Sequence, residues 1–193
     1  SIADRLDTLV GIFAAGQRPS GNKDPFALRR SALGLVRILI EADLCLPLNR
    51  LLALASNALS EQIEVSPELL LDVREFIVDR LRNYYRDQGF GAELISAVLN
   101  SNWDTLPDLD SRLKALSDLM GQSDAAGLAA ANKRIGNILR KSEDDFSREI
   151  DANLFLIEEE LTLFKEVEKL EQQVSQLLEK GNYQASLQLL ASL

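Results

Sequence analysis

The sequence predicts an all-α fold. Leucine and alanine dominate the composition, aromatic residues make up only 6%, and apolar residues recur at spacings of three and four. No alternating apolar and polar segment of useful length indicates a strand. The chain has 193 residues, of which 46% are hydrophobic, enough for one or two packed domains.

The first four helices are expected between prolines, which mark helix starts. They cover residues 3–15, a segment beginning at Pro25 with Asp24 as its N-cap, residues 47–59 and residues 67–88. The fourth has the clearest apolar stripe, with side chains spaced three or four apart. This expected stripe consists of Leu70, Val73, Ile77, Leu81 and Tyr84.

The second half of the chain predicts shorter helices at 91–100, 108–120 and 124–141, and a long acidic helix from about Asn153 to Lys180. The long helix has a seam with alternating spacings of four and three. This seam consists of Leu163, Val167, Leu170, Val174 and Leu177. Two heptads are too few for a coiled coil, so we interpret the helix as one arm of a hairpin that turns at Gly181.

Composition excludes several classes of function. The net charge of −9 argues against generic affinity for nucleic acid or anionic membranes, so any RNA contact must be local. The absence of histidine excludes Ser-His-Asp triads, Cys-His pairs and histidine-ligated zinc. The single cysteine, Cys45, favours a reducing compartment and is expected to be buried among leucines. No apolar run is long enough to span a membrane. The start at Ser1, within a helical pattern, suggests a piece of a longer protein.

The main candidate site is a cluster of bases on the predicted helix 124–141. Its four bases have no acidic residue among them from Ala125 to Ser142, and two asparagines lie at helical spacing with them. These six residues are Asn132, Lys133, Arg134, Asn137, Arg140 and Lys141, beside an apolar face of Ile135, Ile138 and Leu139. Bases on phosphates and asparagines on base edges would suit RNA. The alternative is that bases near a helix C-terminus merely favour its dipole.

A second candidate RNA-binding group lies near the end of the predicted helix 67–88. Tyr85 is expected at the margin of the buried stripe, where a ring can stack on an unpaired base, with Arg82 and Arg86 nearby. Trp103 is either a loop anchor or a stacking platform. A core or anchor role remains the simpler interpretation of both aromatic residues.

Several ordered blocks resemble one known family. They are ADRLDTLVG at 3–11, KDPFALRR at 23–30, YYRDQG at 84–89, AANKRIGNIL at 130–139 and GNYQASL at 181–187. In this order, over nearly the whole chain, they resemble the beta subunit of bacterial glycyl-tRNA synthetase. The DPFALRR and ANKRIGNIL stretches are the most specific.

The resemblance implies a cytoplasmic enzyme of two alpha and two beta subunits that joins glycine to its tRNA using ATP and magnesium. Alpha would carry the catalytic site, and beta would hold and recognise the tRNA. This chain would be a C-terminal fragment of beta: the end of an HD-like helical domain at 1–60, a helical body at 61–123, and an anticodon-binding domain at 124–193 that is truncated at its C-terminus. The 130–139 helix is similar to that of the anticodon-binding domain of arginyl-tRNA synthetases. The fragment alone is expected to be inactive, with no catalytic residue, no bound cofactor, and neither membrane nor DNA as partner.

Alternatives from other classes remain. Asp4 sits where an HD phosphohydrolase would place its last metal-binding aspartate, but no histidine completes that set, so neither metal nor hydrolysis is predicted. A non-enzymatic helical adaptor is the second hypothesis, because residues 177–193 resemble half of a tetratricopeptide unit. No second copy occurs at a period of about 34 residues, and such arrays need about three repeats.

Overall fold

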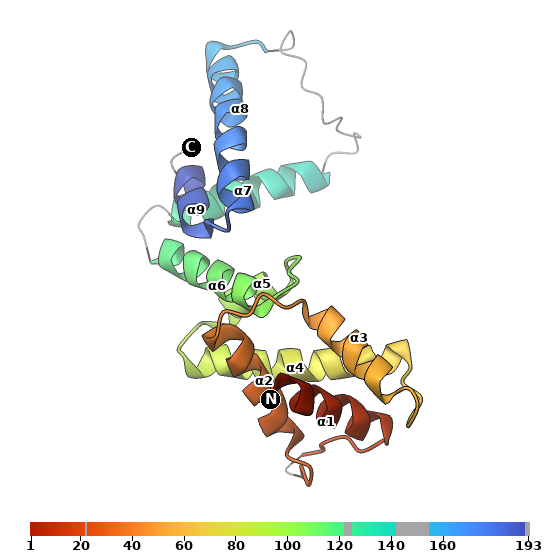
Figure 1. The fold of residues 1–193 in the computed structure, drawn as a ribbon. Helices are drawn as coiled ribbons and strands as arrows, with labels where there is room; N and C mark the ends of the chain where they lie inside the picture. The colour runs from red at the N-terminus through yellow and green to blue at the C-terminus, as the bar shows by residue number, and fades with distance from the viewer. Residues whose placement is uncertain (22, 122–124, 142–154, 192–193) are drawn as a thin grey trace. The chain divides into compact units, whose positions relative to one another are not determined.

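The computed structural model describes residues 1–21, 23–121, 125–141 and 155–191, and all regular elements among them are helices (Figure 1). In chain order these are α1 (Ile2–Ala14), α2 (Leu28–Glu41), α3 (Leu48–Leu59), α4 (Pro67–Asp87), α5 (Ala92–Leu99), α6 (Leu106–Met120), α7 (Ala125–Lys141), α8 (Glu158–Glu179) and α9 (Tyr183–Ala191). The predicted all-α fold is confirmed. None of the described helices is both long and apolar enough to cross a membrane.

The chain divides into two compact units, Ser1–Leu113 and Lys114–Leu193, with the division inside α6. We call them the N-terminal and C-terminal units and describe each by itself. The finer division into domains at 60 and 123 stays a prediction.

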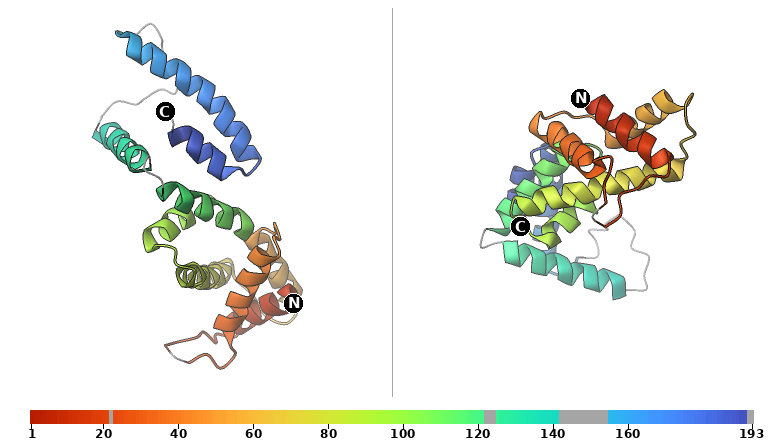
Figure 2. Two further views of the ribbon diagram at one scale, coloured as in Figure 1. Left: turned by 90° about the vertical axis from the view of Figure 1, so that its left-hand side faces the viewer. Right: turned by 90° about the horizontal axis from the view of Figure 1, so that it is seen from below.

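The N-terminal unit is built around α1, which packs against α2, α3 and α4. The right-hand view of Figure 2 shows these helices, coloured from red to yellow, lying together. The side chains at their crossings are apolar and almost fully excluded from solvent. The largest fully buried side chains of this unit, three of them on α6, are Tyr85, Leu9, Leu28, Leu35, Leu39, Leu48, Leu52, Ile77, Leu81, Leu106, Leu109 and Leu113.

Hydroxyl and carboxylate caps set the starts of three of these helices. Ser1 Oγ accepts the amide of Asp4, and Ser66 Oγ accepts the amide of Leu69, each at 3.2 Å. The expected start of α2 at Pro25 is wrong by three residues, because a tight turn comes first. Asp24 nevertheless caps α2, since its carboxylate accepts the amides of Leu28 at 2.8 Å and Arg29 at 3.0 Å.

The stripe of α4 differs from the prediction at its C-terminal end. Tyr85 is fully buried, with an exposed fraction of 0%, whereas Tyr84 is only half-buried. The sequence offers either residue, because both follow Leu81 at a helical spacing of three or four. The structure uses the spacing of four, and the Tyr85 ring packs edge-on against Phe90 with centroids 5.8 Å apart. Leu70, at the other end of the expected stripe, is half-buried.

Cys45 is exposed, so the expectation of a buried thiol is wrong. The α2 helix ends at Glu41, and Asp43 adopts a left-handed backbone with φ of 49°. This reversal places Cys45 in a connecting segment rather than on an apolar helix face. A leucine-rich neighbourhood without helical periodicity therefore does not predict burial.

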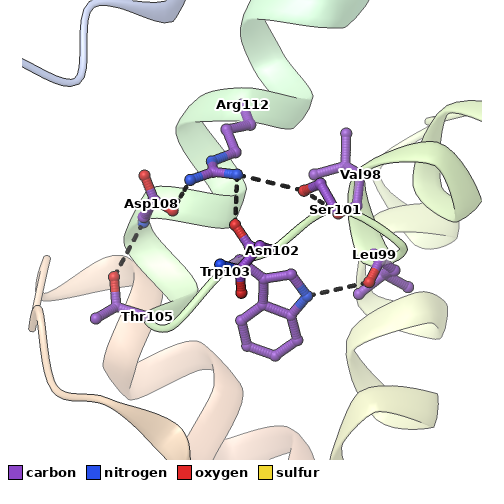
Figure 3. Close-up of polar contacts among 8 residues, drawn as sticks. All are labelled: Val98, Leu99, Ser101, Asn102, Trp103, Thr105, Asp108 and Arg112. Atoms are coloured by element: carbon purple, nitrogen blue, oxygen red, sulfur yellow. Dashed lines mark hydrogen bonds and ion pairs between the residues drawn. The ribbon is translucent and has the colours of Figure 1, made fainter. Parts of the chain in front are cut away.

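Trp103 anchors the segment between α5 and α6 (Figure 3). Trp103 is 9% exposed, and its indole N–H donates to the carbonyl of Leu99 at 3.2 Å. The guanidinium of Arg74 lies 4.9 Å from the ring centroid. The loop-anchor interpretation of Trp103 is confirmed.

Arg112 on α6 completes the same anchor (Figure 3). Its guanidinium donates to the carbonyl of Asn102 at 2.7 Å and to the hydroxyl of Ser101 at 3.3 Å, and it pairs with Asp108 at 2.9 Å. These contacts tie the start of α6 back to the end of α5. The side chains of Arg112 and Asp108 are 29% and 27% exposed, so this pair is better shielded from solvent than a typical surface ion pair.

In the C-terminal unit, α8 and α9 form the predicted helical hairpin. Gly181, with φ of 67°, makes the reversal, and Asn182 Oδ1 caps α9 by accepting the amide of Ala185 at 3.2 Å. At the other end, the Glu160 carboxylate accepts the amides of Leu156 and Ile157. The α8 helix begins at Glu158, not near Asn153, and residues 142–154 lie outside the described part of the chain.

The predicted seam of α8 is covered along only half of its length. Leu170 is 8% exposed, and Val174 and Leu177 are half-buried. Leu163 and Val167 are 55% and 39% exposed. The short α9 therefore covers the C-terminal half of the seam and no described residue covers the rest.

Candidate functional site

The predicted cluster of bases lies on α7, and every one of its six residues is exposed. We call it the α7 strip; it consists of Asn132, Lys133, Arg134, Asn137, Arg140 and Lys141. The helix contacts α9 within the C-terminal unit. That packing leaves the strip available to a partner, as an RNA contact requires.

One side of the α7 strip borders an open hollow of about 340 Å³. Its lining residues are spaced so that they share one face of the helix. They are Ala130, Lys133, Arg134, Asn137, Ile138 and Lys141. Three cationic ends surround a small side chain and an apolar one, an arrangement that suits an anionic group flanked by a flat apolar surface.

Arg140 is held against its own helix. Its Nε donates to the carbonyl of Gly136 at 3.2 Å, and its Nη2 donates to Asn137 Oδ1. The oxygen of Asn137 is therefore engaged, and the amide nitrogen is the part that can reach a ligand. Asn137 would accordingly act as a hydrogen-bond donor rather than as an acceptor toward a ligand.

Charge on the α7 strip is of one sign. No acidic residue occurs from Ala125 to Lys141, and none of the four bases pairs with a carboxylate among the residues that the structure describes. By contrast, Lys169 on α8 pairs with Glu166 at 3.5 Å. The α7 strip thus keeps its positive potential in a chain whose net charge is −9.

Apolar side chains adjoin the α7 strip on the same helix. Ile135, Ile138 and Leu139 are 55%, 56% and 49% exposed. Exposed side chains of this size next to cationic ends form an amphipathic surface rather than a purely ionic one.

The second candidate group, Arg82 with Tyr85 and Arg86, is not brought together as a site. Tyr85 is fully buried and cannot stack on a base, so that expectation is wrong. Burial raises the pKa of its phenol, and the neighbouring carboxylate of Asp110 raises that pKa further. Arg82 pairs with Asp79 on its own helix, while Arg86 is exposed in the last turn of α4.

Asp4 lies exposed in the first turn of α1, where its amide donates to the Ser1 cap. Within the described part of the chain, no three carboxylates or thiols gather as a metal-binding group. The structure thus gives Asp4 a place at a helix start.

The structure also exposes a basic segment before and at the start of α2 that sequence reasoning did not single out. Lys23 and Arg30 are exposed, and Phe26 has an exposed fraction of 45%. Their signal in the sequence was the net charge of the first fifty residues, which is positive in an otherwise acidic chain.

Comparison with known proteins identifies the family. The family model described as "Glycyl-tRNA synthetase beta subunit" matches residues 1–100. Glycine–tRNA ligase beta subunits of Nitrosomonas europaea, Methylobacillus flagellatus and Glaesserella parasuis are 40%, 42% and 42% identical to this chain over its whole length. The chain spans 29%, 27% and 28% of those relatives, respectively.

The comparisons agree with the resemblance carried by the five sequence blocks. Both the family model and the relatives match the block at 23–30, and the relatives extend through α7 and the α8–α9 hairpin. The chain is all-helical and is similar to these beta subunits over its whole length. It therefore belongs to the glycyl-tRNA synthetase beta subunit family.

Proposed function

We propose that this chain is the tRNA-recognition part of the beta subunit of a glycine–tRNA ligase. In the complete enzyme it supports ATP-dependent attachment of glycine to its tRNA by an alpha subunit. The observation that carries this proposal is the exposed α7 strip, a set of cations with no acidic partner among the described residues. Membership of the family supplies the context in which such a surface meets tRNA.

In this mechanism the α7 strip binds the anticodon arm. Lys133, Arg134 and Lys141 border the 340 Å³ hollow and contact phosphates, which fix the register of the RNA. Asn132 and the amide nitrogen of Asn137 reach base edges, which carry the sequence information. Arg140 holds Asn137 in place through their hydrogen bond.

The acidic remainder of the chain serves selectivity. All 30 acidic residues of the chain lie outside the strip, and they would repel an RNA that approaches in the wrong orientation, as the net charge of −9 implies. Glycine anticodons end in two cytosines, whose amino groups are donors that a carboxylate can accept directly. Specificity for glycine tRNA then comes from where the charged side chains lie on the surface, because the chain as a whole attracts RNA only weakly.

The chemistry of ligation belongs to the partner in this proposal. ATP and magnesium are used by the alpha subunit within an assembly of two alpha and two beta subunits in the cytoplasm. This chain holds the tRNA so that its acceptor end reaches that site, and contributes no catalytic residue.

The test uses the complete ligase with Lys133→Ala and Arg134→Ala combined. Each lost phosphate contact should lower the slope of log affinity against log salt by about one, and glycylation at low tRNA concentration should fall in parallel. Lys169→Ala is the matched control, because it removes a lysine that already pairs with Glu166. Unchanged tRNA affinity and charging in the double variant would refute the assignment.

A helical adaptor is the second candidate function, and one observation favours it. Leu163 and Val167 on α8 are exposed although they belong to the apolar seam, as expected of a protein-binding surface. Capture experiments separate the two: glycine tRNA or an alpha subunit retained by the chain supports the ligase, and a peptide partner bound without either supports the adaptor.

A further inference from the structure

The polar side chains of α7 offer a ligand mostly hydrogen-bond donors. From Ala125 to Lys141 the sequence has no serine, threonine, aspartate, glutamate or glutamine. The four cationic side chains of this segment carry donors only, so its side-chain acceptors are the Oδ1 atoms of Asn132 and Asn137. What these two oxygens contact therefore decides which chemical groups the helix can recognise.

Arg140 occupies one of these two acceptors. Side chains on a helix lean toward its N-terminus, so Arg140 lies over the turn that holds Gly136 and Asn137. Its Nη2 donates to Asn137 Oδ1, and its Nε donates to the carbonyl of Gly136 at 3.2 Å. Two hydrogen bonds from one planar guanidinium fix the direction of that group. The amide of Asn137 is thereby oriented, with its oxygen toward a cation and its N–H groups left for a ligand.

The oriented amide belongs to the lining of the 340 Å³ hollow, which it shares with Lys133, Arg134 and Lys141. These three cations donate hydrogen bonds and accept none. The oxygen of Asn137 lies against the Arg140 guanidinium, so a second donor approaching that oxygen meets a positive charge. The hollow therefore favours a ligand edge that presents acceptors, with the apolar side chain of Ile138 beside it.

We propose that Arg140 is a positioning residue, which presents Asn137 as a donor and so lets Asn137 select a base with an unprotonated ring nitrogen. On the Watson–Crick edge, N3 of cytosine accepts a hydrogen bond, whereas N3 of uracil carries a proton and opposes a donor. The α7 strip thus binds cytosine in preference to uracil. This inference rests on the proposed function, and it names the base edge that Asn137 reads in an anticodon that ends in two cytosines.

The experiment compares glycine tRNA with two copies, each of which has one of those anticodon cytosines replaced by uracil. Binding of each RNA to the complete ligase is measured across a series of salt concentrations. The cytosine preference is the ratio of the two affinities, so it does not depend on the fraction of active enzyme. The unchanged ligase should prefer cytosine about tenfold at the position that Asn137 contacts. No preference at either position would refute the inference.

Asn137→Asp is the most direct variant, because it keeps an oxygen for Arg140 and removes the N–H donors. Its carboxylate accepts from the protonated N3 of uracil, so the preference should reverse in favour of uracil. The added negative charge weakens binding of all these RNAs alike and cancels in the ratio. A cytosine preference that survives Asn137→Asp would overturn the inference.

Arg140→Met tests the positioning role, since it removes the guanidinium and keeps a long, flexible side chain. The amide of Asn137 can then present either end, so the cytosine preference should fall toward one while the salt slope stays unchanged. In the background of Asn137→Ala, Arg140→Met should have no further effect on the preference, because Arg140 acts through Asn137. A slope lowered by about one with the preference intact would show that Arg140 contacts a phosphate, and would overturn the inference.

Lys169→Ala is the matched control, because it removes a cation of the same unit that already pairs with Glu166. It should change neither the cytosine preference nor the salt slope. Thermal unfolding of each variant is compared with that of the unchanged enzyme. All three substituted side chains are exposed, so equal melting temperatures are expected.

The combined data separate this inference from the proposed function. If Lys133→Ala with Arg134→Ala weakens binding while the Asn137 and Arg140 variants keep the cytosine preference, this inference alone is refuted. If the preference changes as expected while that double variant binds normally, the phosphate assignment alone is refuted. No effect of either set refutes both.

Discussion

The two units of this chain use apolar residues in opposite ways. In the N-terminal unit, leucines such as Leu9, Leu35 and Leu39 are fully buried at helix crossings. Among the described residues of the C-terminal unit, the buried apolar side chains are Ala115, Leu119 and Leu170. Ile135, Ile138, Leu163 and Val167 belong instead to exposed helix faces.

The buried leucines of the N-terminal unit stabilise its fold, whereas the C-terminal unit presents exposed apolar surface. A core that excludes water contributes to the free energy of unfolding in proportion to the apolar area it buries. An exposed apolar helix face contributes little to it and remains able to bind. The α7 strip adjoins such a face and is itself exposed, so its substitution should change binding more than stability.

The largest expected effect is a core truncation in the N-terminal unit. Leu35→Ala should lower the free energy of unfolding by about 2–5 kcal/mol, because Leu35 is fully buried and a cavity remains. Ile138→Ala, at a side chain that is 56% exposed, should change it by less than about 0.5 kcal/mol. Hydrogen exchange followed by mass spectrometry measures both opening free energies within one chain. Equal losses would contradict the contrast.

The second prediction concerns pH. The folded-state pKa of Tyr85 is raised by burial, whereas in the unfolded chain it should be about 10. The contribution of Tyr85 to the free energy of unfolding is therefore complete below pH 10. Above pH 10 the phenol ionises first in the unfolded state, so the free energy of unfolding falls by about 1.4 kcal/mol per pH unit. Urea unfolding followed by circular dichroism should show this decline, and Tyr85→Phe should remove that part of it. An identical slope in the variant would show that the phenol is not protected.

The third prediction compares two caps. Asp24→Ala should cost about 1 kcal/mol, since it frees the amides of Leu28 and Arg29 at the start of α2. Glu160→Ala, at the start of α8, should cost about 0.5 kcal/mol, because the amides it frees are exposed to water. Amide exchange at the first turn of each helix is the measurement, and a larger loss at α8 would reverse the comparison.

The smallest expected effect comes from two glycines inside helices. Gly136→Ala should stabilise α7 by about 0.5–1 kcal/mol, because nothing lies within 4 Å of the added Cβ. At Gly34 the added Cβ would lie 2.4 Å from Arg5 Nη1, so Arg5 must move and the gain should cancel to about zero. Helicity and melting temperature of the two variants test this, and equal gains would show that Arg5 packing contributes nothing.

Much of this fold could be predicted from the sequence, because helical periodicity and caps are local signals. Pro67 located the start of α4, and Gly181 located the hairpin reversal. Local signals failed where two choices were nearly equal. Tyr84 and Tyr85 are both compatible with the apolar period, and tertiary packing against Phe90 selected Tyr85.

The candidate site shows the same limit. The bases of the α7 strip could be located because they lie on one helix with no acid among them. The exposure of Phe26 could not be located in this way, because Phe26 lies in an irregular segment that ends at a left-handed Ala27. Whether a basic side chain forms an ion pair also depends on the tertiary structure. Arg18 pairs with Asp72, which lies more than fifty residues away in the chain.

Trp103 gives the molecule a built-in optical label. It is the sole tryptophan of the chain, its ring is shielded from water, and the guanidinium of Arg74 lies over its face. Tryptophan fluorescence therefore reports on the N-terminal unit alone. RNA held only by α7 should leave this emission untouched, whereas melting of the segment around Trp103 should shift it to the red.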